Sequence, residues 1–120
     1  MADRMLIVTW NEPVRGSEAR AVEVFNDALG ILGRKQQDGA IESFDVALLA
    51  PNGFIDGFIY IKGSEAQISA LRNDEEWIRN TIDATLNVDC IRHIEGYCNE
   101  GVASQMGMYE EAIGKVPQRA

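Results

Sequence analysis

Residues 40–62 read AIESFDVALLAPNGFIDGFIYIK, and this stretch decides the fold. Two runs rich in β-branched and aromatic residues, 40–50 and 54–62, flank Pro51-Asn52-Gly53. An Asn-Gly pair between such runs is the strongest short signal for a β-hairpin. A two-residue turn would place Pro51 opposite Phe54 and fix the register of every earlier pair. The sequence therefore predicts two antiparallel strands joined at Asn52-Gly53.

The predicted hairpin has one apolar face and one mixed face, because successive side chains of a strand point to opposite sides. The apolar face carries Phe44, Val46, Leu48, Ile55, Ile59 and Ile61. The mixed face carries Ser43, Asp45, Ala47, Leu49, Asp56, Phe58, Tyr60 and Lys62. We expect helices to cover the apolar face and leave the mixed face open.

The segments on both sides of the hairpin alternate between strand and helix patterns. In chain order they predict a strand at 4–11, a helix at 17–37, the hairpin, helices at 64–72 and 74–86, a strand at 88–98 and an amphipathic helix at 101–115. This order indicates an α+β protein with a four-stranded antiparallel sheet, a ferredoxin-like βαββαβ unit. We expect a single domain over 1–120, with its core in 4–98 and a C-terminal helix and tail in 99–120.

Local signals set the ends of the predicted helices. Ser17 is a favourable N-cap, and Asp38-Gly39 stops the first helix. Ser64 and Gln67 have the spacing of a capping box, and Asp74 starts the next helix. The first helix carries two neighbouring apolar stripes that together form a broad face for the sheet: Val22, Phe25, Leu29, Leu32, and Ala21, Val24, Ala28, Ile31.

Composition and charge exclude several kinds of partner. The chain has 120 residues, of which 46% are hydrophobic and 25% charged, as in ordinary globular domains. Its net charge of −8 repels phosphate backbones, which argues against nucleic-acid binding. Residues 57–61 (GFIYI) resemble the RNP1 motif of RNA-binding domains, but Asp56 stands where that motif has a basic residue.

The ends of the chain and its cysteines predict a cytoplasmic protein. The apolar run after Arg4 is too short for a signal peptide or a membrane span, so we expect no membrane partner. Cys90 and Cys98 would lie about 26 Å apart on one strand, at about 3.3 Å per residue. A disulfide needs Cα atoms within about 7 Å, so we expect two reduced thiols.

The element order resembles that of the dimeric α/β-barrel superfamily, whose protomers are ferredoxin-like. The resemblance covers residues 4–98 and rests on the two flanking strands, the Asn52-Gly53 hairpin and a split second helix with Trp77 after an acidic cap. In that superfamily the helix-free sheet faces of two protomers close into a barrel with a pocket in each half. The resemblance implies a homodimer. The predicted helix at 101–115 lies outside the βαββαβ unit and outside the resemblance, and we expect it to cover a partner subunit.

The alternation of side chains, extended to the outer strands, predicts which residues would line such a barrel. Thr9 and Asn11 would share the open face of the first strand. In the last strand we expect Val88, Cys90, Ile94 and Cys98 to face the helices and Ile91, His93, Glu95 and Tyr97 to face the open side. The predicted pocket therefore collects Thr9, Asn11, Asp45, Phe58, Tyr60, His93, Glu95 and Tyr97.

Several of these residues suit acid–base chemistry. His93, the single histidine, titrates near neutrality and is the candidate proton carrier. Asp45 or Glu95 could orient the imidazole, and Tyr60 and Tyr97 could donate a hydrogen bond to a developing oxyanion. The predicted catalytic set is thus His93, Asp45, Tyr60 and Glu95, and the predicted binding set is Thr9, Asn11, Phe58 and Tyr97.

Three functions are compatible with this pocket. An enzyme would perform cofactor-independent monooxygenation, isomerisation or cyclisation of an enolisable substrate, with His93 carrying the proton. A sensing or binding module would hold a small organic ligand without a base, and a purely structural dimer would fill the space with aromatic side chains. One histidine and two distant cysteines do not build a zinc site. We expect no cofactor, although haem is compatible with the resemblance, since some superfamily members bind it.

Overall fold

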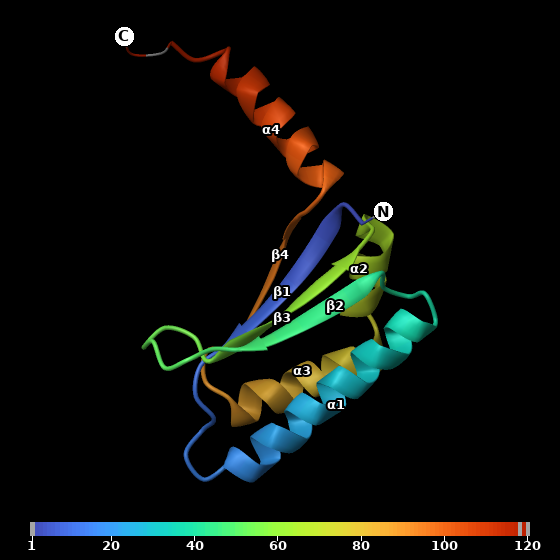
Figure 1. Ribbon diagram of the computed structural model, residues 1–120, viewed down its shortest axis with the longest axis vertical. Helices are drawn as coiled ribbons and strands as arrows, with labels where there is room; N and C mark the ends of the chain where they lie inside the picture. The colour runs from blue at the N-terminus through green and yellow to red at the C-terminus, as the bar shows by residue number, and fades with distance from the viewer. Residues whose placement is uncertain (1, 118, 120) are drawn as a thin grey trace.

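The computed structural model, which describes residues 2–117 and 119, is built on one antiparallel sheet (Figure 1). Its strands are β1 (Arg4–Trp10), β2 (Ser43–Leu48), β3 (Gly57–Gly63) and β4 (Arg92–Tyr97). They lie in the order β2-β3-β1-β4, and every neighbouring pair is antiparallel. This order is that of a ferredoxin-like βαββαβ unit, so the predicted α+β architecture is confirmed.

Two long helices and one short helix occupy the same side of the sheet, and a fourth helix extends away from it (Figure 1). They are α1 (Glu18–Gln37), α2 (Glu65–Arg72), α3 (Glu75–Asn87) and α4 (Glu100–Ile113). None of the described helices combines the length and hydropathy that a membrane span requires.

The helix starts follow the capping signals. Ser64 and Gln67 form the predicted capping box, in which Ser64 Oγ accepts from the Gln67 amide and Gln67 Oε1 accepts from the Ser64 amide. Asp74 accepts a hydrogen bond from the Trp77 amide at the start of α3. Ser17 occupies the N-cap position of α1, but its side chain makes no capping hydrogen bond.

The hairpin register is as predicted, whereas its strands are shorter. Asp45 lies opposite Tyr60, as a turn at Asn52-Gly53 requires. The strands end at Leu48 and Gly57, and residues 49–56 form a loop. Within it the Asn52 carboxamide donates to Ala50 O and accepts from the Phe54 amide, and Gly53 adopts φ 81°. The Asn52 side chain shapes the tip of the loop, because it bonds backbone groups that would otherwise pair between the two strands.

The core lies between the sheet and α1, α2 and α3. It consists of the buried side chains Leu6, Val8, Ala28, Ile31, Leu32, Ile41, Ile59, Ile61, Ile68, Leu71 and Trp77. The broad apolar face predicted for α1 is only partly buried, because Val22 is exposed. On the facing side of β2, Leu48 is 73% exposed, so α1 does not cover this corner of the sheet.

The predicted facing of the last strand is wrong. The register pairs Val8 with His93 and Leu6 with Glu95, and residues directly opposite each other share a face of the sheet. His93, Glu95 and Tyr97 therefore lie on the helix side, while Arg92 and Ile94 lie on the open side. The prediction assumed that the apolar residues of this strand turn inward. On this edge strand the polar side chains turn inward instead, because Arg72 of α2 pairs with Glu95 there.

Candidate functional site

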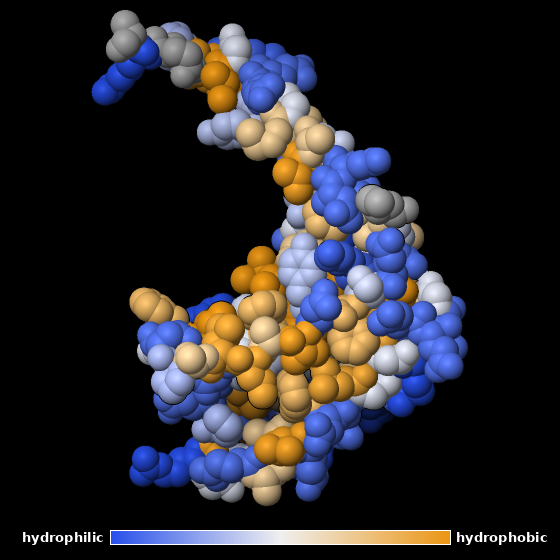
Figure 2. All heavy atoms as spheres, viewed as in Figure 1, coloured by the Kyte–Doolittle hydropathy of each residue, from blue (hydrophilic) through white to orange (hydrophobic). Residues whose placement is uncertain are grey.

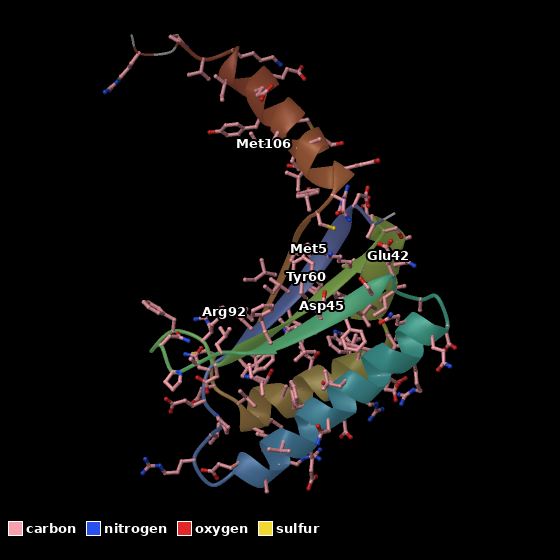
Figure 3. All side chains as sticks on the ribbon, viewed as in Figure 1. Met5, Glu42, Asp45, Tyr60, Arg92 and Met106 are labelled. Atoms are coloured by element: carbon pink, nitrogen blue, oxygen red, sulfur yellow. The ribbon has the colours of Figure 1, made fainter. Side chains whose placement is uncertain are left out.

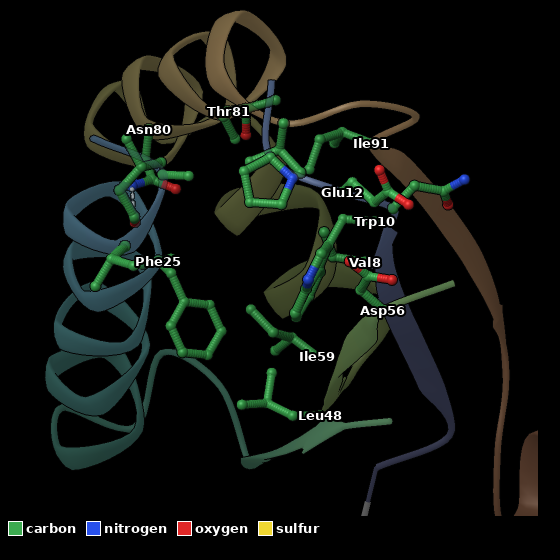
Figure 4. A pocket seen from close by; sticks show the side chains of 18 of the residues that line it. Val8, Trp10, Glu12, Phe25, Leu48, Asp56, Ile59, Asn80, Thr81 and Ile91 are labelled. Atoms are coloured by element: carbon green, nitrogen blue, oxygen red, sulfur yellow. Dashed lines mark hydrogen bonds between the residues drawn. The ribbon is translucent and has the colours of Figure 1, made fainter. Parts of the chain in front are cut away.

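A pocket of about 600 Å³ lies between the helix side of the sheet and α1 and α3 (Figure 4). Its walls are mostly apolar and come from the sheet and from both helices. The sheet contributes Val8, Trp10, Leu48 and Ile59; α1 contributes Ala21, Val24, Phe25 and Ala28; and α3 contributes Trp77, Thr81 and Ala84. It is the space that α1 leaves at the uncovered corner of the sheet.

The indole of Trp10 forms one wall, and a glycine makes its position possible. Its ring meets Phe25 of α1 edge to face, with centroids 5.6 Å apart. On the neighbouring strand, a Cβ added to Gly57 would lie 2.7 Å from Trp10 Cζ2 and 2.7 Å from the carbonyl oxygen of Ala47. Gly57 therefore lets the indole lie directly against β3, as a glycine within a strand often does.

Few polar groups reach the pocket, and two of them are engaged within the protein. Asn80 Nδ2 donates to Val24 O at 3.0 Å, which ties α3 to α1. Thr81 Oγ1 donates to Trp77 O at 2.9 Å within α3. The His93 imidazole makes no hydrogen bond to any described residue, so its nitrogens are available to a ligand.

The surroundings of His93 favour its neutral form. Burial lowers the pKa of its imidazole, and the positive charge of Arg72 lowers this pKa further. The ring stands edge to face with Trp77 at 6.3 Å between centroids, which explains part of the burial. A neutral imidazole has one nitrogen that donates and one that accepts, so it can take up a proton from a bound molecule.

The lowered pKa of His93 predicts a loss of stability in mild acid. Because the unfolded chain then binds more protons than the folded chain, stability should fall as pH drops below the ordinary histidine pKa of about 6.5. Urea unfolding between about pH 7.5 and about pH 5 should show this fall in the wild type and a smaller fall in His93→Gln. Equal falls in the two proteins would show that His93 titrates alike in both states.

The predicted site residues lie in three places. Only His93 and Asn11 line the large pocket. Glu95 and Tyr97 border a second, polar hollow of about 240 Å³, where Glu95 Oε2 lies 2.5 Å from Arg72 Nη1 and Tyr97 stacks under Arg4. The remaining four lie on the open face of the sheet, as predicted: Thr9, Asp45, Phe58 and Tyr60. The eight residues therefore do not form one pocket within a protomer.

The pocket also contains residues outside the predicted site. Trp10 and Trp77 both line it, although neither was among the candidate site residues. Asn80 and Thr81 carried no signal in the sequence, because a polar residue on a helix is usually exposed. The sequence feature that points to this site is Gly57, since a glycine within a strand indicates that another group packs closely against that strand. Among the described residues, no three side chains of His, Cys, Asp or Glu form a group that could hold a metal ion.

Comparisons with known proteins give information on the fold alone. No protein-family model matches the sequence. No curated protein matches it either. Among solved structures, the chain is similar to a dimeric protein of unknown function with a ferredoxin-like fold from Bacteroides fragilis. The TM-score is 0.59 at 11% identity, and the match covers 82% of this chain and 98% of the other. This similarity supports the ferredoxin-like fold.

Proposed function

We propose that the protein binds a small, mostly apolar organic molecule between the sheet and helices α1 and α3. The observation that carries the proposal is the cavity of about 600 Å³, whose apolar walls surround an imidazole that hydrogen-bonds to no described residue and whose neutral form is favoured. Its volume lies within the range of about 300–1,000 Å³ that is usual for ligand sites. His93 would make the principal directional contact, and the apolar walls would supply most of the affinity.

The same arrangement supports a catalytic role for His93. A ligand with an acidic C–H or O–H beside the imidazole could lose a proton to it. The proposed chemistry is therefore proton transfer on an enolisable molecule without a cofactor. The alternative is a binding module that uses His93 only as a hydrogen-bonding group.

We further propose that the protein acts as a homodimer. The open face of the sheet presents apolar side chains that include Ile7, Phe58 and Ile94. The similar protein from Bacteroides fragilis is described as dimeric. Two copies that joined their open faces would enclose Thr9, Asp45 and Tyr60 between them, apart from the pocket with His93.

The pocket can be tested with a neutral apolar dye and the protein's own fluorescence. Trp10 and Trp77 are the only tryptophans of the chain, and both line the pocket. N-phenyl-1-naphthylamine bound there should brighten and quench tryptophan emission, saturating at one molecule per chain. Ala84→Phe, which places a ring in the cavity from α3, should weaken binding by about tenfold or more, equivalent to about 1.4 kcal/mol.

Two further variants complete the experiment. Ala70→Phe adds the same ring at an exposed position of α2 away from the pocket, so it should bind the dye like the wild type. His93→Gln should also bind the apolar dye, because the walls supply the affinity. Equal binding by Ala84→Phe and Ala70→Phe would contradict the proposed site.

A further inference from the structure

Helix α4 carries an apolar stripe that the protomer does not cover. Val102, Met106 and Tyr109 repeat at helical spacing and are 48%, 50% and 63% exposed. A 14-residue helix is marginal in water without a packed face, and Gly101 and Gly107 lower its propensity further. Its stability therefore requires a surface against which this stripe can pack.

The first turn of α4 is anchored, which fixes the direction in which the helix leaves the sheet. Asn99 Nδ2 donates to Ala2 O at 2.8 Å, and the Cys98 amide donates to Asp3 O at 3.1 Å. Gly101 is buried against the same segment, where an added Cβ would overlap the carbonyl oxygen of Asp3. These contacts direct α4 away from its own sheet, and the stripe stays exposed within the protomer.

The apolar side of α4 and the open face of the sheet border one hollow. Figure 2 shows apolar atoms along the inner side of α4 and across the floor of the hollow, with hydrophilic atoms on the outer side of the helix. Figure 3 shows Met5, Tyr60 and Arg92 on the side of the sheet away from α1 and α3. The open-face side chains of the sheet are Met5, Ile7, Thr9, Ser43, Asp45, Ala47, Phe58, Tyr60, Lys62, Arg92 and Ile94.

The charges around the hollow complement each other between two copies. The sheet face carries Lys62 and Arg92 along with Asp45. On α4, Glu110 lies next to the apolar stripe. A net charge of −8 per chain opposes association, so local pairing of opposite charges is needed to bring two copies together. Glu110 on α4 of one copy can pair with a basic side chain on the sheet face of the other copy, which meets this need.

From the anchored, uncovered α4 and the hollow beside it, we propose that α4 is a docking arm that packs against a second copy of this chain seated in the hollow. The inference rests on the proposed homodimer and adds the arm to its interface. In a two-fold arrangement each copy offers the same surface, so both arms are covered at once. The stripe of Val102, Met106 and Tyr109 then lies inside the dimer.

The test measures the mass of the full chain by sedimentation and light scattering over a dilution series. One chain has a mass of 13.3 kDa, so a dimer has 2 × 13.3 = 26.6 kDa. The wild type should be a dimer, and Met106→Glu should raise its dissociation constant at least about tenfold. Ser104→Glu adds the same charge on the opposite side of α4 and should leave the dimer intact. Tyr109→Glu repeats the test one turn further along the stripe.

A variant of the sheet face separates the arm from the rest of the dimer. If Ile94→Glu dissociates the dimer while Met106→Glu and Tyr109→Glu leave it intact, the proposed dimer stands and the arm is overturned. A wild-type chain that stays at 13.3 kDa at every concentration overturns both proposals. Urea unfolding of each variant shows whether a monomer is folded, and a folded Met106→Glu monomer supports the arm.

Discussion

Replacing Trp77 by alanine should lower the free energy of unfolding by about 3–5 kcal/mol, the range for large aromatic residues removed from a core. Trp77 is 4% exposed and belongs to the core between α3 and the sheet. Its removal would leave a cavity that merges with the neighbouring pocket and would take away the ring against which His93 stands. Urea unfolding followed by circular dichroism measures the loss.

Ile78→Ala is the matched control for Trp77. Ile78 is the next residue of α3 and is 40% exposed, so its truncation should cost less than about 1 kcal/mol. The Asp74 cap of α3 bonds the backbone of residue 77 and is unaffected by either change. A loss of similar size in both variants would mean that Trp77 does not anchor α3 to the sheet.

Gly57→Ala should destabilise the protein by about 1–3 kcal/mol, as expected for atoms forced into a packed position. The new methyl group would lie 2.7 Å from the Ala47 carbonyl oxygen and 2.7 Å from the Trp10 indole. The carbonyl belongs to the β2–β3 ladder and cannot move freely, so the indole must shift. Because Trp10 is a wall of the pocket, its emission and the binding of N-phenyl-1-naphthylamine should change together.

Gly33→Ala is the control for Gly57→Ala. An added Cβ at Gly33 meets no atom within 4 Å, and the residue lies within α1. Alanine should therefore be neutral or stabilise the protein by up to about 1 kcal/mol. A harmless Gly57→Ala with unchanged tryptophan emission would contradict the close packing of Trp10 on β3.

The hairpin shows how far local patterns predict this fold. Asn52-Gly53 fixed the register of β2 and β3, and the alternation around it identified the covered face correctly. The capping box at Ser64 and the acidic start at Asp74 located two helix ends. These signals act between residues close in the chain, so they can be read without knowing the rest of the structure.

The last strand shows where such patterns fail. Apolar Ile94 lies on the open face, and His93 and Glu95 lie towards the helices. The alternation of apolar and polar residues suggested the reverse. The outcome depends on Arg72 of α2 and Trp77 of α3, which meet these side chains only after the chain has folded. The hydrophobicity of its residues alone therefore does not reveal which face of this edge strand turns towards the helices.

The sequence by itself determined the order of the elements, the hairpin register and the presence of one histidine suited to acid–base chemistry. Only the tertiary structure placed that histidine in a pocket with Trp10 and Trp77 and separated it from Asp45 and Tyr60 on the other face. The physical reason is the distance along the chain over which the deciding interactions act. Turns, caps and alternation follow from neighbouring residues, whereas a pocket depends on how far α1 covers the sheet and on which strand ends meet the helices.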